Sequence, residues 1–185
     1  MEVEETGLPG VLVISPKVFG DARGFFVESY QAERYRSHGL PERFVQDNAS
    51  LSRRGVIRGL HYQWPHPQGK LVQVLRGEIY DVAVDVRRGS PHFGRFTAVT
   101  LNGDSLRQIY IPPGFAHGFC VLSEEAIFHY KCTDYYHPEH ERTLRWDDPA
   151  LAIPWPLREA GVLSPKDAAA PLLAEMPEEF LPGLS

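Results

Sequence analysis

Residues 80–86 read YDVAVDV, with apolar side chains at every even position and Asp81 and Asp85 between them. Successive side chains of a β-strand point to opposite faces of a sheet, so this alternation is typical of a strand with one buried and one solvated face. We therefore predict a half-buried strand at 80–86.

Short apolar runs of the same kind lie on both sides of this strand, separated by clusters of Gly, Pro, Asn, Asp and Ser. Only 31–38 and 167–170 have a helical pattern, and both are short. Strands that recur every 8 to 12 residues or so, without helices between them, predict an antiparallel sandwich or barrel. The runs lie at 24–30, 56–63, 70–75, 95–101, 107–111, 115–122 and 126–133.

Prolines concentrate toward the C-terminal end, where eight of the sixteen lie at or after residue 138. Proline donates no backbone hydrogen bond, so it rarely occurs inside a central strand. We expect the segment from about 139 to 185 to wrap around the barrel. A length of 185 residues fits a single domain, 1–185, with the barrel core at about 24–135.

The composition excludes several classes of protein. The chain has 19 Lys and Arg against 24 Asp and Glu, a net charge of -5, which argues against nucleic acid or a membrane as partner. Cys120 and Cys132 fit no zinc spacing and are too few for a disulfide framework, so we expect a cytoplasmic protein. No segment has the roughly 18 apolar residues of a membrane helix, and the N-terminus MEVEE is acidic where a signal peptide is basic.

Seven of the eight histidines lie between His61 and His140, which raises the question of a metal-binding cupin. Residues 112–117, PPGFAH, match the second half of the cupin motif, Pro-x-Gly-x-x-His. In the first half, Trp64 and Lys70 stand where two metal ligands belong. Zn, Mn and Fe sites need about three neutral or anionic donors, and a lysine repels the ion. We therefore predict a cupin-type jelly-roll barrel with no metal in its cleft.

A metal-free cleft with His, Tyr and Lys suits proton transfer next to a carbonyl group. Histidine, with a pKa of about 6.5, can remove a proton near neutral pH, and tyrosine can return one from the opposite side. A lysine or arginine beside the carbonyl oxygen stabilises the enolate. Together such groups invert a stereocentre without a cofactor.

Side-chain alternation indicates which residues enter the cleft. Tyr130 lies on the apolar face of its strand, whereas His129 and Lys131 face outward. His117 also lies on an apolar face. An inward histidine or tyrosine is more often an ordinary core residue with a satisfied polar group, so the functional interpretation requires several such residues to converge.

Six segments carry a more specific signal: FGDARGFF at 19–26, FVQDNAS at 44–50, RGLHYQ at 58–63, GFAHGF at 114–119, YKCTDYY at 130–136 and LSPKD at 163–167. In this order they resemble the dTDP-4-dehydrorhamnose 3,5-epimerase family, from about residue 10 to 172. The resemblance implies a cofactor-independent isomerase that epimerises C3 and C5 of dTDP-4-dehydro-6-deoxy-D-glucose, giving dTDP-4-dehydro-L-rhamnose for dTDP-L-rhamnose biosynthesis.

The resemblance also implies roles for individual residues. His61 is the expected base at C5 and C3, and Asp167 is the acid that pairs with it. Tyr130 is expected to return a proton to the opposite face, and Lys70 to stabilise the enolate. The implied contacts to the nucleotide sugar are Arg23, Glu28, Gln46, Asp47, Asn48, Arg58, His117, Glu141 and Lys166, whose basic members suit a diphosphate.

The expected partners are a dTDP-4-keto-6-deoxy sugar and, by the same resemblance, a second copy of the chain. The apolar segment 11–14 is a candidate strand for the homodimer interface. Three alternatives stay open: an epimerase that acts on one carbon only, a non-catalytic cupin that binds sugar nucleotides, and a metal-dependent cupin oxygenase. Retention of both His61 and Asp167 disfavours the non-catalytic alternative.

Overall fold

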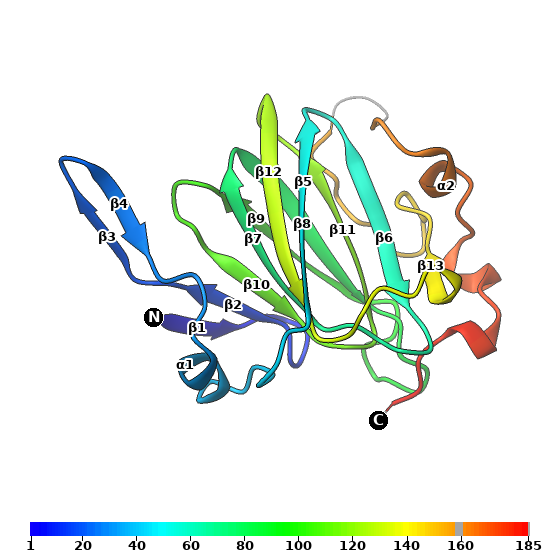
Figure 1. The fold of residues 1–185 in the computed structure, drawn as a ribbon. Helices are drawn as coiled ribbons and strands as arrows, with labels where there is room; N and C mark the ends of the chain where they lie inside the picture. The colour runs from blue at the N-terminus through cyan, green and yellow to red at the C-terminus, as the bar shows by residue number, and fades with distance from the viewer. Residues whose placement is uncertain (158–160, 185) are drawn as a thin grey trace.

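Two β-sheets that face each other form the body of the molecule in the computed structural model, which describes residues 1–157 and 161–184 (Figure 1). The six-stranded sheet contains, in spatial order, β1 (Glu2–Glu5), β2 (Leu12–Ser15), β10 (Gln108–Ile111), β7 (Lys70–Arg76), β12 (Glu125–Cys132) and β5 (Gln46–Arg53). The five-stranded sheet contains β13 (Glu141–Thr143), β6 (Ile57–Gln63), β11 (Phe115–Val121), β8 (Glu78–Asp85) and β9 (Phe96–Asn102). Neighbouring strands in both sheets run antiparallel, so the all-β prediction is confirmed.

The strand predicted at 80–86 is present as β8, but the prediction that one of its faces is solvated is wrong, because β8 is buried on both faces. Ala83 packs in the cluster between the two sheets, while Val82 and Val84 pack in a second cluster on the other face of β8. Side chains of the C-terminal segment, among them Leu151 and Leu173, complete that second cluster. Burying both faces removes more apolar surface from water than a solvated outer face would, which stabilises the sheet.

The C-terminal segment also pairs with the sheets through its backbone. Val162 forms a bridge with Val56, and Gly183 forms one with Arg88. Its regular elements are short: α2 (Pro165–Ala168) and the 3₁₀ turns η1 (Pro138–His140), η2 (Leu173–Glu175) and η3 (Glu178–Phe180). Together with α1 (Ala32–Arg36), they leave no helix in the described residues that is long and apolar enough to cross a membrane.

Strand β5 is an element that the sequence analysis missed. Its sequence, QDNASLSR, has no aromatic or β-branched residue, the types that are enriched in strands. It lies at the edge of the six-stranded sheet, where β12 is its only partner among the described strands, and most of its side chains are partly or fully exposed. An edge strand needs a weaker apolar pattern, because one of its sides faces solvent.

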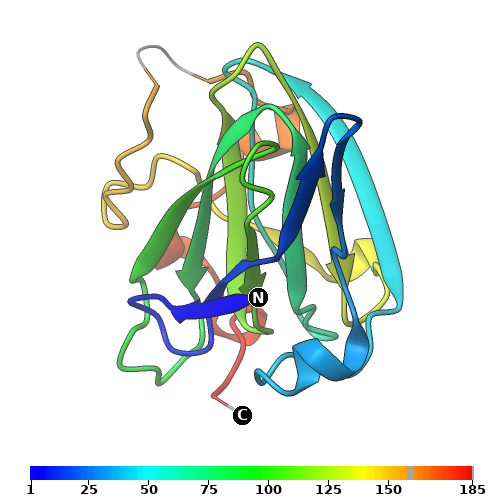
Figure 2. The same ribbon diagram turned by 90° about the vertical axis from the view of Figure 1, so that its left-hand side faces the viewer.

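Segment 11–14, expected as a strand at the homodimer interface, is paired within its own chain through β2. β2 pairs with β1 on one side and with β10 on the other, so neither of its edges is free, and Val13 and Ile14 are buried within the chain. The six-stranded sheet therefore starts well before residue 24. A separate hairpin, β3 (Val18–Asp21) and β4 (Gly24–Val27), extends away from the body in Figure 1 and lies in front of it in Figure 2, which looks from that side.

Candidate active site

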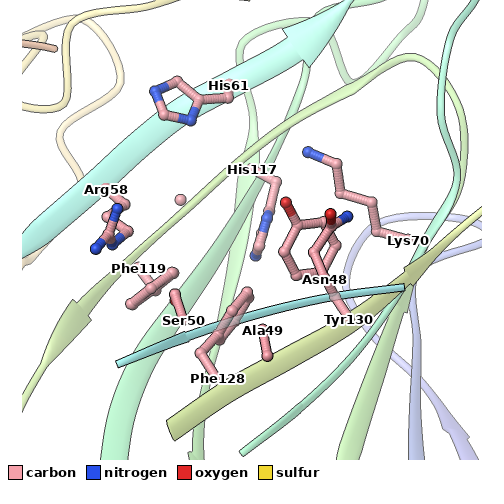
Figure 3. A pocket seen from close by; sticks show the side chains of 11 residues that line it. Asn48, Ala49, Ser50, Arg58, His61, Lys70, His117, Phe119, Phe128 and Tyr130 are labelled. Carbon is pink, nitrogen blue, oxygen red and sulfur yellow. The ribbon is translucent and has the colours of Figure 1, made fainter. Parts of the chain in front are cut away.

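A pocket of about 310 Å³ opens between the two sheets (Figure 3). Each sheet contributes one wall of the pocket, so the lining residues come from strands that are distant in sequence. The five-stranded sheet supplies Arg58, His61, His117, Gly118 and Phe119, and the six-stranded sheet supplies Asn48, Ala49, Ser50, Lys70, Phe128 and Tyr130. Three of the four predicted catalytic residues, His61, Lys70 and Tyr130, therefore line one pocket.

Arg58 and His61 both face the pocket because β6 has an irregular register. His61 pairs with His117 and Arg58 with Phe119, so a step of three residues on β6 matches a step of two on β11. The extra residue puts two positions of opposite parity on the same face, as a β-bulge does. Gly59, at φ +123°, allows this conformation.

Gly59 and Gly118 let the two strands approach closely behind the bulge. A Cβ on Gly59 would lie 2.5 Å from the Cα of Gly118, and a Cβ on Gly118 would lie 2.7 Å from the carbonyl oxygen of Arg58. No side chain larger than hydrogen fits at either position. Both glycines thereby help to place Arg58 and His61, the side chains of β6 that face the pocket.

His61 and Asp167 form a hydrogen-bonded pair, with 2.6 Å between Nε2 and Oδ1. The carboxyl of Asp167 is buried, which by itself raises its pKa; its hydrogen bonds to His61 and Ser164 and the charge of His61 outweigh that effect and lower the pKa. An ionised carboxylate only accepts hydrogen bonds, so the hydrogen between the two residues belongs to His61 Nε2, and Nδ1 is the nitrogen left to exchange a proton with a substrate. This arrangement suits a general base.

The short helix α2 fixes the position of Asp167. Ser164 caps the helix by accepting a hydrogen bond from the backbone N–H of Asp167 at 3.1 Å, and Pro165 takes the first helical position. Next to it, Lys166 donates to Glu141 Oε2 at 2.7 Å. Burial raises the pKa of Glu141, but the hydrogen bonds from Lys166 and Tyr136 and the nearby positive charges together hold it below its ordinary value.

Tyr130 and Lys70 face the pocket from the opposite wall to His61 (Figure 3). Burial raises the pKa of Tyr130 to about 12, so its hydroxyl stays protonated near neutral pH. Burial lowers the pKa of Lys70, and the nearby Cys132, Glu141 and Asp81 offset part of this shift. A phenol that keeps its proton can act as an acid, and an ammonium group beside it can stabilise negative charge on an oxygen.

His117 is held by Asp81, a residue that the sequence analysis did not assign to the site. Asp81 Oδ2 lies 2.9 Å from His117 Nε2, and Asp81 is fully buried. The signal was present in the sequence, since a carboxylate inside an apolar strand requires a partner when it is buried. Alternation alone assigns Asp81 to a solvated face, because it does not reveal that a second layer covers the valine face of β8.

Phe119 and Phe128 join the two walls of the pocket. Their rings stack with centroids 4.3 Å apart and an interplanar angle of 20°. Phe119 belongs to β11 and Phe128 to β12, so this pair bridges the sheets directly. It forms part of the apolar floor of the pocket.

The remaining predicted contact residues differ in their placement. Asn48 lines the pocket and accepts a hydrogen bond from Gln46, at 3.1 Å. Arg58 donates to Ser52 Oγ at 3.0 Å. Asp47 has the opposite parity to Asn48 and pairs with Lys131 at 2.8 Å, so the structure does not bring its side chain into the pocket.

Arg23 and Glu28 also lie outside this pocket, on and just after the β3–β4 hairpin. Arg23 pairs with Asp21 in the hairpin turn, and Glu28 pairs with Arg34 of α1. Phe25 and Phe26 on the same hairpin are 60% and 68% exposed. Within one chain, therefore, these residues do not meet His61.

The comparisons with known proteins agree with this geometry. Residues 5–175 match the sequence profile of a family described as dTDP-4-dehydrorhamnose 3,5-epimerase. The chain is 52% identical to a Pseudomonas aeruginosa protein of that name, over 95% of this chain and 97% of the relative.

Solved structures of similar proteins also superimpose closely. A Legionella pneumophila dTDP-6-deoxy-D-glucose-3,5-epimerase, solved in complex with dTDP-4-keto-L-rhamnose, is 56% identical with a TM-score of 0.97, covering 100% of this chain and 98% of that one. A Bacillus anthracis dTDP-4-dehydrorhamnose 3,5-epimerase with TDP and PPi bound is 46% identical with a TM-score of 0.89, covering 92% and 98%.

Proposed function

Since this chain belongs to the dTDP-4-dehydrorhamnose 3,5-epimerase family, we propose that its pocket epimerises C3 and C5 of dTDP-4-dehydro-6-deoxy-D-glucose to give dTDP-4-dehydro-L-rhamnose. The observation that carries this proposal is the placement of a histidine and a tyrosine on opposite walls of the pocket. His61, bonded to Asp167 at 2.6 Å, enters from one sheet, and Tyr130 enters from the other. The product serves dTDP-L-rhamnose biosynthesis.

The reaction begins when His61 removes the proton at C5, next to the 4-keto group, and an enolate forms. Asp167 stabilises the imidazolium that results. The ammonium of Lys70 stabilises the negative charge on the enolate oxygen. Tyr130 then donates its hydroxyl proton to the opposite face of the carbon, which inverts the centre.

The same sequence at C3 completes the double epimerisation. Each cycle moves one proton from carbon to His61 and one from Tyr130 to carbon, so no electron acceptor is needed. Tyr130 regains its proton from solvent and His61 releases one. The side chains account for each proton, and the ammonium of Lys70 disfavours a metal ion in the same space.

The nucleotide diphosphate is the expected partner of the cationic residues around the pocket. Arg58 lines the pocket itself, and Lys166 lies on α2 beside Asp167. A guanidinium binds phosphate oxygens through two parallel hydrogen bonds. We infer that Asn48, Gln46, His117 and Glu141 bind and orient the sugar nucleotide together with these cations.

A second copy of the chain is the proposed source of Arg23 and Glu28. The hairpin that carries Arg23 extends away from the body and exposes Phe19, Phe25 and Phe26, and such aromatic exposure favours an interface. We propose a homodimer in which this hairpin reaches the pocket of the other copy. We also propose a cytoplasmic location, since Cys120 and Cys132 are both free thiols.

Product analysis in deuterated water tests the reaction. The protein is incubated with dTDP-4-dehydro-6-deoxy-D-glucose, and NMR then measures deuterium at C3 and C5. We expect exchange at both carbons and inverted product, and no exchange with the His61→Asn variant. Exchange at one carbon alone would assign a single-carbon epimerase, and exchange at neither would contradict the proposed reaction.

Mixing two inactive variants tests the dimer. An Arg23→Ala copy keeps His61, and a His61→Asn copy keeps Arg23, so a mixed dimer regains one complete site if the hairpin acts on the other copy. We expect the mixture to recover activity that neither variant has alone. Failure to recover it, with dimers confirmed by sedimentation, would place Arg23 at the site of its own chain or at no site.

A further inference from the structure

Three histidines and two carboxylates gather outside the pocket, where β6 and β12 end. The rings of His66 and His137 stack at 4.5 Å, and His140 lies 5.5 Å from His66. Asp134 and Glu139 border this group. None of the five residues lines the pocket that holds His61, so the reaction does not account for them.

The donor atoms of three of these residues converge. One ligand atom each from His66, Asp134 and His137 lies within 4.8 Å of the other two. His66 Nδ1 is 3.6 Å from Asp134 Oδ2, close to the ~3.3 Å expected for two ligands of one tetrahedral ion with bonds of about 2.0–2.1 Å. The second oxygen, Asp134 Oδ1, accepts the backbone N–H of Tyr135 at 2.8 Å, which orients the carboxylate.

A buried glutamine holds the two loops that carry these donors. Gln63, 4% exposed at the end of β6, donates through Nε2 to the carbonyl oxygen of His66 at 2.5 Å. It also donates to the carbonyl of Tyr135 at 3.0 Å and accepts the backbone N–H of His137 at 2.8 Å. The backbone of each histidine is therefore fixed from the interior before any ligand binds.

We propose that His66, Asp134 and His137 bind one divalent transition-metal ion of the class that prefers imidazole, with Zn²⁺ as the representative. Two imidazoles and one carboxylate form a common donor set for Zn²⁺, and water completes the coordination. Glu139 Oε1 lies 3.7 Å from His137 Nδ1, where it can orient that ring through its second nitrogen. The bound ion ties the loop after β6 to the loop after β12 and is separate from the reacting atoms.

Calorimetric titration of the metal-stripped protein with ZnCl₂ tests the site. We expect one Zn²⁺ per chain and at least about tenfold weaker binding after His137→Ala or Asp134→Asn. His66 has φ +65°, so His66→Asn is the suitable third variant, because asparagine tolerates that backbone. Zn²⁺ should also raise the melting temperature of the wild type, by mass action, and not that of His137→Ala.

Two matched histidine variants locate the ion. His38 is exposed beyond α1, far from the cluster in sequence, and His38→Ala should bind Zn²⁺ like the wild type. His61→Asn removes the imidazole of the catalytic pocket and should also leave the stoichiometry at one. Loss of binding in His61→Asn, undiminished binding in His137→Ala, or no binding by the wild type would each overturn the proposal.

Discussion

Asp81 and His117 form a buried pair on neighbouring strands, with 2.9 Å between Oδ2 and Nε2. Replacing the carboxylate by an amide loosens the orientation of His117, a predicted contact of the sugar nucleotide. We expect Asp81→Asn to raise the KM for the nucleotide sugar about tenfold with little change in kcat. Steady-state kinetics measures both constants.

Asp85 provides the control for this prediction, since it is fully buried on the same strand but pairs with Arg87 and Ser90. Asp85→Asn should lower the free energy of unfolding, by about 1–3 kcal/mol, without raising KM. If Asp81→Asn folds and its KM is unchanged, the role of Asp81 is structural only.

Replacing His61 should separate the binding of the nucleotide from catalysis. His61→Asn should lower kcat by about 10²–10⁴-fold, the usual contribution of a general base. Binding of dTDP should stay close to that of the wild type, because the diphosphate contacts are assigned to other residues. Stopped-flow assays and calorimetry measure the two effects, and a parallel loss of dTDP affinity would contradict the assignment of His61 as the base.

Tyr130→Phe removes the proposed acid but keeps the ring that packs on Phe128 at 5.4 Å. His61 is intact in this variant, so deuterium should still enter at C5, while inverted product fails to form. NMR of the sugar reports exchange and configuration in the same sample. An unchanged yield of inverted product would exclude Tyr130 as the acid.

Loss of the proton from Lys70 should set the alkaline limit of activity, at a lower pH than an ordinary lysine would. Burial lowers the pKa of Lys70, so the ammonium loses its proton at a lower pH than an ordinary lysine. The cation is present below the lowered pKa, and kcat/KM should fall as pH rises through it. In Lys70→Arg the cation persists above pH 12 or so, which should move the limit upward.

Lys131→Arg is the matched control for the pH profile, because Lys131 pairs with Asp47 away from the pocket. Its alkaline limit should equal that of the wild type. If Lys70→Arg retains activity and the limit does not move, another group titrates there.

Gly118→Ala tests the close approach behind the bulge. The added methyl group would lie 2.7 Å from the carbonyl oxygen of Arg58, so β6 and β11 must separate. We expect a loss of about 1–3 kcal/mol in the free energy of unfolding, measured in urea, together with lower activity. Gly183→Ala, which meets nothing within 4 Å, should change neither.

Alternation along the chain was enough to predict most strands of the two sheets, and it correctly placed Tyr130 and His117 on inward faces. It failed where parity is broken or a strand is covered twice. Arg58 and His61 share a face only because β6 contains an extra residue opposite β11. Asp81 is buried because the C-terminal segment and the other sheet enclose β8 from both sides.

The sequence predicted those residues of the candidate site that lie in the segments resembling the family. The resemblance named His61, Lys70 and Tyr130, and the structure brings them to one pocket, with Asp167 bonded to His61 behind it. It gave no indication that Arg23 lies on a hairpin away from that pocket. Such a placement depends on how a segment leaves the body, which a local sequence pattern does not encode.

The stack of Phe119 on Phe128 belongs to the hydrophobic core, so we expect the stereochemical selectivity of the reaction to depend on core packing. His61, the proposed base, lies on the five-stranded sheet and Tyr130, the proposed acid, on the six-stranded sheet, and the Phe119–Phe128 stack bridges the two sheets in the same pocket. A substitution that widens this spacing would let the enolate form while its reprotonation becomes less selective. Directed changes in the core can therefore produce an enzyme that scrambles a carbon centre instead of inverting it.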